Sequence, residues 1–314
     1  MPVQPPFSHE LLTDTRLQAK KIGPMYASMR GEHLQELAAV EALVREAAPL
    51  AISYDVHRAQ APYFHEFTYT ECLGGGLLVS PQSVEVSARM VQMALDQSDQ
   101  GFDAAPAILE QRQQRGTLDK YRLNESTSPG PKAVAFIPGS NCFSEMVSRE
   151  VLARAMADDP GMVIKPHPMS DGELVAGLVR DFGYYRILDP RESGDACLMD
   201  AETVYATTTT EMGLYAVLMG KPVHNIGNFF NEGRGTYSAF YRPLWGKTPA
   251  DAGATLRKAL NSPYGGFFHK DDPNLPDRID RYFKAVMTVR EVMKPLIWTP
   301  PPPMLNRAQP PANK

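Results

Sequence analysis

The strongest constraint on the fold is a regular alternation of apolar runs and amphipathic stretches that begins after Pro131. Apolar residues recur at helical spacing in residues 144–157, 171–182 and 211–219. Between and around these predicted helices lie short apolar runs, the predicted strands, at residues 133–137, 162–164, 185–188, 203–206 and 222–226. Strands of this kind that alternate with helices are typical of a doubly wound parallel sheet, so the sequence predicts an α/β domain here.

The rest of the chain gives less regular signals. Further helices are predicted at residues 32–48, 84–95 and 276–296, a strand at residues 50–54, and a turn feeding a strand within residues 68–80. Residues 96–131 are polar, and we interpret residues 123–131 as a linker. A chain of 314 residues has room for two domains. The predicted division is an N-terminal α/β domain (1–130), a C-terminal domain with a long final helix (131–298) and a disordered proline-rich tail (299–314).

Composition excludes several classes of protein. The net charge is −4 without a long run of Lys or Arg, which gives no special reason to expect nucleic acid or an anionic membrane as a partner. Cys72, Cys142 and Cys197 are too few and too widely spaced for a disulfide framework or a zinc site. No apolar stretch reaches the roughly 20 residues that span a bilayer. The first residues do not resemble a signal peptide, so a cytoplasmic location is predicted.

Four polar segments follow predicted strands, at residues 138–141, 165–168, 207–210 and 227–230. In open α/β sheets, ligands bind beyond the carboxyl ends of the strands. We therefore expect these four segments to meet at one edge of the sheet. Ser140, Asn141 and Asn228 are candidate ligand-binding residues from the first and the last segment.

The segment at residues 165–168 reads Lys-Pro-His-Pro. Each proline fixes its own φ and keeps the residue before it out of the helical region. His167 is therefore held between two constraints directly after a buried strand. A structural histidine is the ordinary interpretation of a lone His, but the flanking prolines and Lys165 favour a functional one.

Residues 207–210 are four threonines that precede a predicted helix. At least one of their hydroxyls is expected to cap the first turn of that helix. The free amides of the turn and the helix dipole also favour an anion, so Thr209 and Thr210 are candidates for binding a nucleotide phosphate. Glu211 would repel the phosphate unless its carboxylate points away.

Three ordered blocks carry a family resemblance. The Lys-Pro-His-Pro block is followed by Thr-Thr-Glu-Met-Gly-Leu-Tyr-Ala-Val-Leu-Met-Gly-Lys at residues 209–221 and by Gly-Asn-Phe-Phe-Asn-Glu-Gly-Arg-Gly-Thr at residues 227–236. Over residues 133–245 the chain resembles the capsule-polysaccharide (Kdo-transferase-like, KpsC/KpsS-type) glycosyltransferases. The resemblance implies a GT-B fold of two Rossmann-type domains, with an acceptor-side domain first and the nucleotide-sugar-binding domain second.

The resemblance also assigns roles to residues. It implies that His167 contacts the donor phosphate, that Thr210 takes the place of a family Ser or Thr, and that the helix at 213–221 lies beside the nucleotide. Tyr215 stands where the family has a glutamate, which in such folds holds the donor ribose. A tyrosine cannot accept two hydrogen bonds from a diol, and Glu211, one helical turn earlier, is the candidate replacement.

The implied reaction is sugar transfer through an oxocarbenium-like transition state without a metal. His167, Lys165 and the helix start would stabilise the departing phosphate. A base must deprotonate the acceptor hydroxyl, and Asp55, at the end of a predicted strand, is our first candidate. The other candidates from the N-terminal part are His57, His65, Glu66 and Glu71.

Several alternatives stay open at this point. The expected ligands are a CMP- or UDP-type nucleotide sugar as co-substrate, with no tightly bound cofactor, and a glycan or glycolipid acceptor. A modified base in DNA is an alternative acceptor, and a non-catalytic nucleotide-binding or scaffold protein is a third hypothesis. An aromatic-rich stretch is interpreted mainly as core packing, and it comprises Phe229, Phe230, Tyr237, Phe240, Tyr241 and Trp245.

Overall fold

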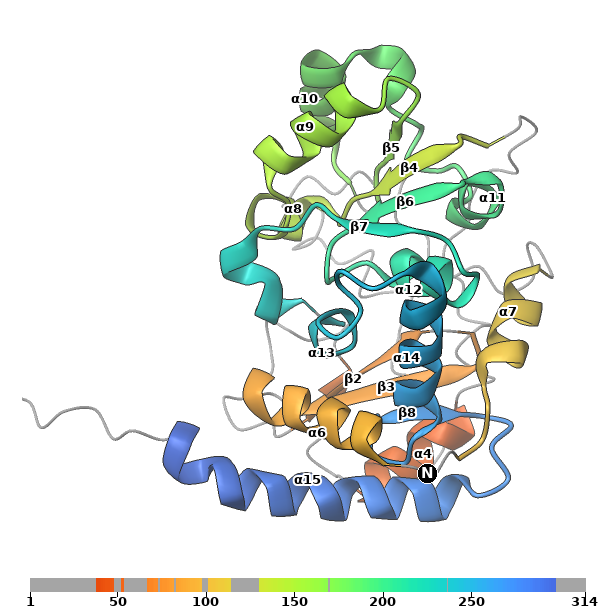
Figure 1. The fold of residues 1–314 in the computed structure, drawn as a ribbon, viewed down its shortest axis with the longest axis vertical. Coiled ribbons are helices and arrows are strands. Elements are labelled where there is room, and N and C mark those ends of the chain that lie inside the picture. Colours follow the sequence, from red (N-terminus) through yellow and green to blue (C-terminus); the bar gives the residue numbers. More distant parts are fainter. Residues whose placement is uncertain are drawn as a thin grey trace, which may run out of the picture.

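The structure is a computed structural model that describes residues 38–47, 52–53, 67–72, 74–81, 83–97, 101–113, 130–168, 170–235 and 237–297. Two four-stranded sheets lie in the upper and lower halves of the molecule in Figure 1. Between them lies α14 (Pro249–Asn261), which packs against α12 (Glu211–Leu218) of the upper half and α6 (Val84–Asp96) of the lower half. No helix among these described residues is long and apolar enough to cross a membrane.

The upper sheet is parallel, as the sequence predicts. Its order is β5-β4-β6-β7, formed by β4 (Ala133–Phe136), β5 (Val163–Lys165), β6 (Thr203–Ala206) and β7 (Val223–Asn225). Successive side chains of β4 enter different cores. Val134 and Phe136 join the cluster under α12, whereas Ala133 and Ala135 join the one on the opposite face. This two-sided burial explains why β4 is continuously apolar in sequence.

The predicted single helix at residues 144–157 is wrong, because two helices occupy this region. α8 (Ser140–Met146) ends at Val147, which forms a bridge with Gly227, and α9 (Arg149–Asp158) then begins. The Ser148 hydroxyl caps α9 by accepting a hydrogen bond from the Val151 backbone. The pairing of Val147 with a distant residue draws this segment out of the helical conformation.

The predicted strand at residues 185–188 is also wrong. After α10 (Gly172–Phe182), the 3-10 helix η1 (Tyr184–Arg186) occupies the first half of this stretch, and Ile187 alone forms a parallel bridge, to Ile164 of β5. The Arg186 guanidinium donates to three backbone carbonyls, at Met156, Asp159 and Met162. These bonds hold the turn beside β5. A further helix, α11 (Gly194–Asp200), follows and was not predicted.

The lower sheet is mixed and therefore differs from the expected second Rossmann-type sheet. β1 (Ile52–Ser53) runs parallel to β2 (Phe67–Cys72), and β2 runs antiparallel to β3 (Gly76–Pro81). Gly74 and Gly75, with φ of 49° and 72°, make the tight turn between β2 and β3. The fourth strand, β8 (Phe267–His269), comes from near the far end of the chain and pairs antiparallel with β3.

The predicted terminal helix is confirmed as α15 (Leu275–Ile297), which runs along the bottom of the molecule in Figure 1. It packs against α6 and against α4 (Ala38–Ala47), so the last helix covers the sheet made mostly by the first part of the chain. The sequence did not predict α7 (Ala105–Gln113), η2 (Phe229–Arg234), α13 (Ser238–Tyr241), α14 or β8.

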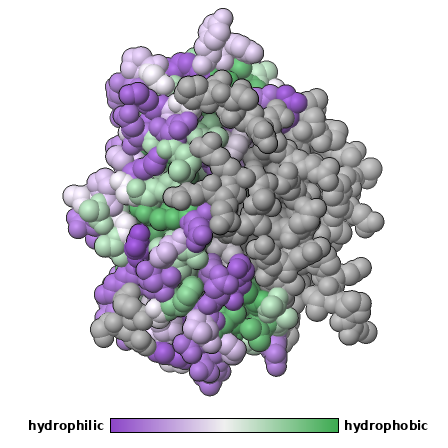
Figure 2. All heavy atoms as spheres, turned by 90° about the vertical axis from the view of Figure 1, so that its right-hand side faces the viewer, coloured by the Kyte–Doolittle hydropathy of each residue, from purple (hydrophilic) through white to green (hydrophobic). Residues whose placement is uncertain are grey.

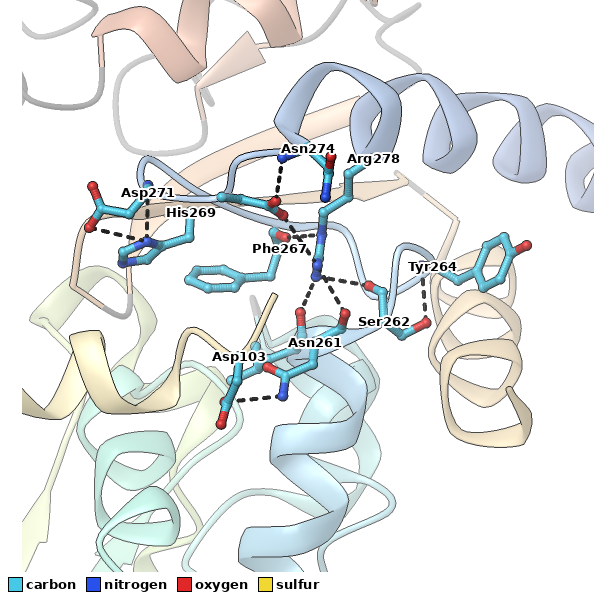
Figure 3. Close-up of polar contacts among 11 residues, drawn as sticks. Asp103, Asn261, Ser262, Tyr264, Phe267, His269, Asp271, Asn274 and Arg278 are labelled. Atoms are coloured by element: carbon cyan, nitrogen blue, oxygen red, sulfur yellow. Dashed lines mark hydrogen bonds and ion pairs between the residues drawn. The ribbon is translucent and has the colours of Figure 1, made fainter. Parts of the chain in front are cut away.

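Arg278 joins α15 to the end of α14 (Figure 3). Its side chain is 6% exposed, and its guanidinium donates to the backbone carbonyls of Leu260, Asn261, Ser262 and Phe267. The Asp272 carboxylate lies 3.5 Å from Nη1. Because the last carbonyls of a helix have no partner within the helix, this arginine completes the end of α14 and fixes β8 beside it.

Candidate functional site

The four polar segments predicted from the sequence all follow the carboxyl ends of paired parallel strands, at one edge of the upper sheet. Two hydrogen bonds tie neighbouring segments together. Ser140 Oγ accepts a bond of 2.8 Å from the Asp171 backbone, and Thr210 Oγ1 donates over 3.5 Å to the Phe136 carbonyl. Residues that are far apart in sequence therefore share one rim.

The strand order reverses at this rim. The chain leaves β4 to build β5 on one side, and then returns to build β6 on the other side of β4. Such a reversal is a topological switch point, the place where α/β sheets bind ligands. The loops at its two walls are residues 137–140 after β4 and residues 207–210 after β6. This location is a property of the described topology and does not depend on any motif.

Two helices begin at the switch point, α8 and α12. Gly139 precedes α8 and has no side chain to cap it, and the Thr210 side chain makes no capping bond to α12. The expectation that a threonine hydroxyl caps this helix is therefore wrong for the residue at the cap position. The first amides of a helix carry partial positive charge and favour an anion. The first amides of α12 therefore lie beside the switch point.

The threonine hydroxyls bond to one another instead of to the helix. Thr207 Oγ1 lies 2.7 Å from Thr209 Oγ1 and 3.1 Å from Thr210 Oγ1. Thr207 is completely buried, Thr210 is 9% exposed and Thr209 is half-buried. The cluster is consequently a rigid turn in which Thr209 reaches furthest toward solvent.

The chain that follows β7 supports this turn from below. Tyr237 donates its backbone hydrogen to the Thr208 carbonyl at 2.9 Å, and the Tyr241 hydroxyl donates to the Thr210 carbonyl at 2.6 Å. Gly213 is required here, because a Cβ at this position would overlap the Tyr241 hydroxyl. The buried aromatic residues Tyr237 and Tyr241 therefore hold the start of α12 in place, as the core-packing interpretation predicts.

Lys165 lies inside the loop rather than on its surface. It is 3% exposed, and Nζ donates to the carbonyls of Pro166 at 2.7 Å and Pro190 at 2.9 Å. Burial lowers the pKa of Lys165 to about 8, although Cys197, Glu192 and Asp189 act in the opposite direction. In this position the ammonium group holds the Pro-His-Pro turn against the next segment. Direct contact of Lys165 with a phosphate stays a prediction that this burial does not favour.

His167 is half-buried, and its carbonyl accepts a hydrogen bond of 2.8 Å from the Ser170 backbone. Pro166 and Pro168 on either side are buried, so the turn is fixed as the sequence predicts. The Ser170 hydroxyl is fully buried without a hydrogen-bond partner among the described residues. The contact between His167 and a donor phosphate stays a prediction.

Two side chains contact the Glu211 carboxylate. Arg112 Nη2 lies 4.0 Å from Glu211 Oε1, and the Tyr237 hydroxyl donates to Glu211 Oε2 at 3.4 Å. Arg112 Nη1 also donates to both carboxylate oxygens of Asp195, at 3.1 Å and 3.0 Å. We call Arg112, Asp195, Glu211 and Tyr215 the arginine cluster. In this cluster the guanidinium balances the carboxylate charge in the first turn of α12.

Tyr215 is fully buried beneath this arginine. The Arg112 guanidinium carbon lies 3.9 Å from the centre of the Tyr215 ring, and Nη2 donates to the Tyr215 hydroxyl. Burial by itself lowers the pKa of Arg112, but Tyr215, Asp195 and Glu211 outweigh it, so the pKa stays above its ordinary value. A donor contact by Tyr215 stays a prediction that its burial does not favour.

The predicted residues Asn141 and Asn228 lie at the same rim. Asn141 is exposed in the first turn of α8. Asn228 donates its backbone hydrogen to Met146 at 2.9 Å, and its side-chain oxygen accepts from the Phe230 backbone at 3.1 Å. Asp55 lies outside the described residues, as do His57, His65 and Glu66, and the Glu71 side chain is not described either.

Sequence reasoning missed Arg112 and Asp195. Arg112 lies in a polar stretch without helical periodicity, and its partners follow 83 and 103 residues later.

The aromatic stretch also differs in part from its interpretation, because Phe229 and Phe230 are 80% and 90% exposed. On the face that carries α7 and α11, Figure 2 shows hydrophobic side chains in the middle of the molecule and again toward its lower end, among hydrophilic ones.

The chain matches no protein-family model and no curated protein. A similar solved structure is that of the wall teichoic acid polymerase TagF, at 13% sequence identity and a TM-score of 0.25. The match covers 66% of this chain and 44% of that chain, so this chain spans less than half the length of that polymerase. A likeness of this strength carries no argument about fold or function.

Proposed function

We propose that this chain is a glycosyltransferase that moves a sugar from a CMP- or UDP-type donor to a hydroxyl of a glycan or glycolipid. The observation that carries the proposal is the switch point between β4 and β6, where α12 begins without a side-chain cap. The order of the three sequence blocks supports sugar transfer rather than another reaction of nucleotides. All three blocks follow strands that end at this edge of the sheet.

The expected chemistry follows from the reaction. The bond between the sugar's anomeric carbon and the donor phosphate breaks, and a bond from that carbon to the acceptor oxygen forms. Negative charge grows on the departing phosphate, where His167 and the first amides of α12 would stabilise it. The acceptor proton passes to a base, for which Asp55 is our candidate. No metal is needed for these steps.

The first test is a thermal-unfolding screen of the whole chain with CMP, UDP, GDP and ADP. A nucleotide that binds only the folded state stabilises it by about 2.7 kcal/mol at a concentration 100 times its Kd. We expect CMP or UDP to raise the unfolding temperature more than the two purine nucleotides. Absence of a shift with all four would contradict the proposed donor site.

Catalysis is tested with His167→Ala. We expect turnover of the donor to fall by about 10²–10³-fold, which is the usual cost of removing one group that stabilises developing charge. His224→Ala is a matched control, because His224 is an exposed histidine on β7 that packs against Tyr205. Equal turnover by His167→Ala and the wild type would overturn the catalytic role of His167.

A second candidate is a nucleotide-binding protein without transferase activity. It is favoured by the arginine cluster, which engages Glu211 and buries Tyr215, the two residues considered for the donor ribose. The two candidates differ in one outcome. Selective nucleotide binding without donor hydrolysis or transfer, across a set of glycan and glycolipid acceptors, would support the second.

A further inference from the structure

We infer that Arg112 is a positioning residue for the donor phosphate, acting by neutralising Glu211 at the start of α12. The inference rests on the proposed function, because it concerns the same anion site. It goes further by assigning part of that site's charge balance to α7, a helix that precedes the parallel-sheet unit in the chain. The sequence blocks that carry the resemblance do not include this residue.

Two carboxylates share the Arg112 guanidinium. Asp195 lies in the first turn of α11 and Glu211 in the first turn of α12, and both side chains are largely shielded, at 14% and 26% exposed. Two carboxylates suit the dipoles of their own helices, but together they oppose a phosphate at the start of α12. Arg112 is the cation that contacts both of them within the described part of the chain.

The guanidinium carbon of Arg112 lies 3.9 Å from the centre of the Tyr215 ring, Nη1 pairs with Asp195, and Nη2 lies 4.0 Å from Glu211 Oε1. The Tyr237 hydroxyl donates to Glu211 Oε2. Both oxygens of the carboxylate therefore have a neighbour, and the guanidinium balances the Glu211 charge in the first turn of α12.

Neutralisation of Glu211 by Arg112 can be distinguished from a role in packing alone. If Arg112 only joined α7 to α11 and α12, its loss would act on folding, and removal of the Glu211 charge would not restore ligand affinity. If Arg112 acts by neutralising Glu211, its loss should weaken binding much more while Glu211 is charged than after that charge has been removed. A cycle of Arg112→Gln and Glu211→Gln distinguishes the two, because both substitutions remove charge and keep the side chains polar.

The experiment measures binding of inorganic pyrophosphate, and of the nucleotide that best stabilises the wild type, by calorimetry on variants shown to be folded. We expect Arg112→Gln to weaken both by about 10–100-fold, because the substitution removes a positive charge beside Glu211. In the Glu211→Gln background the same change should cost less than about threefold. Arg149→Gln is the matched control, because Arg149 forms a more exposed pair, with Asp181 at 3.0 Å.

Each outcome decides the inference. An equal loss in both backgrounds, or no loss from Arg112→Gln, would overturn it. If the glutamine variant is not folded, Arg112→Met takes its place in the cycle, because methionine keeps the packing against Tyr215 without the charge. If the wild type binds pyrophosphate but no nucleotide, the proposed function is refuted. The cycle measured with pyrophosphate then still tests the role of Arg112. Binding of neither would overturn both.

Discussion

Two largely shielded arginines, Arg112 and Arg278, connect distant parts of this chain in opposite ways. Arg278 is surrounded by backbone carbonyls, and burial lowers its pKa to about 10 although Asp272 acts to raise it. Arg112 is surrounded by Asp195, Glu211 and Tyr215, which overcome the effect of burial and raise its pKa. The same residue type therefore serves as a structural tie at Arg278 and as a counter-charge at Arg112.

This difference indicates which of the two arginines can influence ligand binding. The carbonyls around Arg278 belong to the end of α14 and to β8, and their role is complete once the chain has folded. The carboxylates around Arg112 belong to the first turns of two helices, one of which borders the switch point. A change at Arg278 should act on stability, and a change at Arg112 should act mainly on binding.

The largest expected effect is that of Arg278→Met on stability. The substitution leaves several buried carbonyls without a partner, and each costs about 1–3 kcal/mol, so we expect a loss of about 3–5 kcal/mol after partial relaxation. Urea unfolding monitored by circular dichroism measures it. Arg278→Lys should recover less than half of the loss, since one ammonium group cannot serve the same set of carbonyls. A loss below about 1 kcal/mol would show that Arg278 is not a structural tie.

Lys165 provides a second buried cation on carbonyls, with a pH dependence that can be measured. Its pKa is lowered from 10.5 to about 8, so between these values the unfolded chain binds more protons than the folded chain. Stability from this group therefore rises as pH increases from about 8 to 10.5, by about 3 kcal/mol in total. We expect the wild type to gain this much relative to Lys165→Met across that range. Parallel stability curves for the two proteins would contradict the expected shift.

Gly213→Ala tests the support of α12 without altering any charge. The added Cβ would overlap the Tyr241 hydroxyl, so we expect a loss of about 1–3 kcal/mol from overpacking. Tyr241→Phe in the same chain removes the overlapping atom and should recover part of that loss. If the double variant is less stable than additivity predicts, the crowding lies elsewhere.

The smallest expected effect on stability is that of Arg112→Gln. Its pair with Asp195 is 18% and 14% exposed, and we expect a cost of about 1–2 kcal/mol, clearly below that of Arg278→Met. Thermal unfolding of the two variants side by side measures the contrast. An equal cost at both positions would remove the distinction between the structural tie and the counter-charge.

The sequence predicts those elements whose signals are local. Strand β6 coincides with its predicted range, and α12 ends where Gly220, at a φ of 73°, closes it as expected. The split between α8 and α9 depends on a bridge from Val147 to Gly227, and the mixed sheet depends on β8 returning to β3. Pairings of this kind lie far apart in the chain and leave no local signal.

The residues of the candidate site likewise divide into those with a local signal in the sequence and those without one. Thr210 and His167 follow buried strands, and strand ends can be read from apolar runs and prolines. Arg112 has no such marker, and its role depends on Asp195 and Glu211, which the fold brings to it. The burial of Lys165 likewise follows from the position of the Pro190 carbonyl, which the sequence does not reveal.

The central claim, that a nucleotide phosphate binds at the start of α12, is tested most directly by comparing Thr210→Asp with Thr210→Asn. Both residues are good helix caps and nearly equal in shape, so they differ mainly in one negative charge at the proposed phosphate position. Calorimetry on variants shown to be folded should show that Thr210→Asp binds pyrophosphate and the preferred nucleotide at least about tenfold more weakly than Thr210→Asn. Equal affinities of the two variants would contradict the claim.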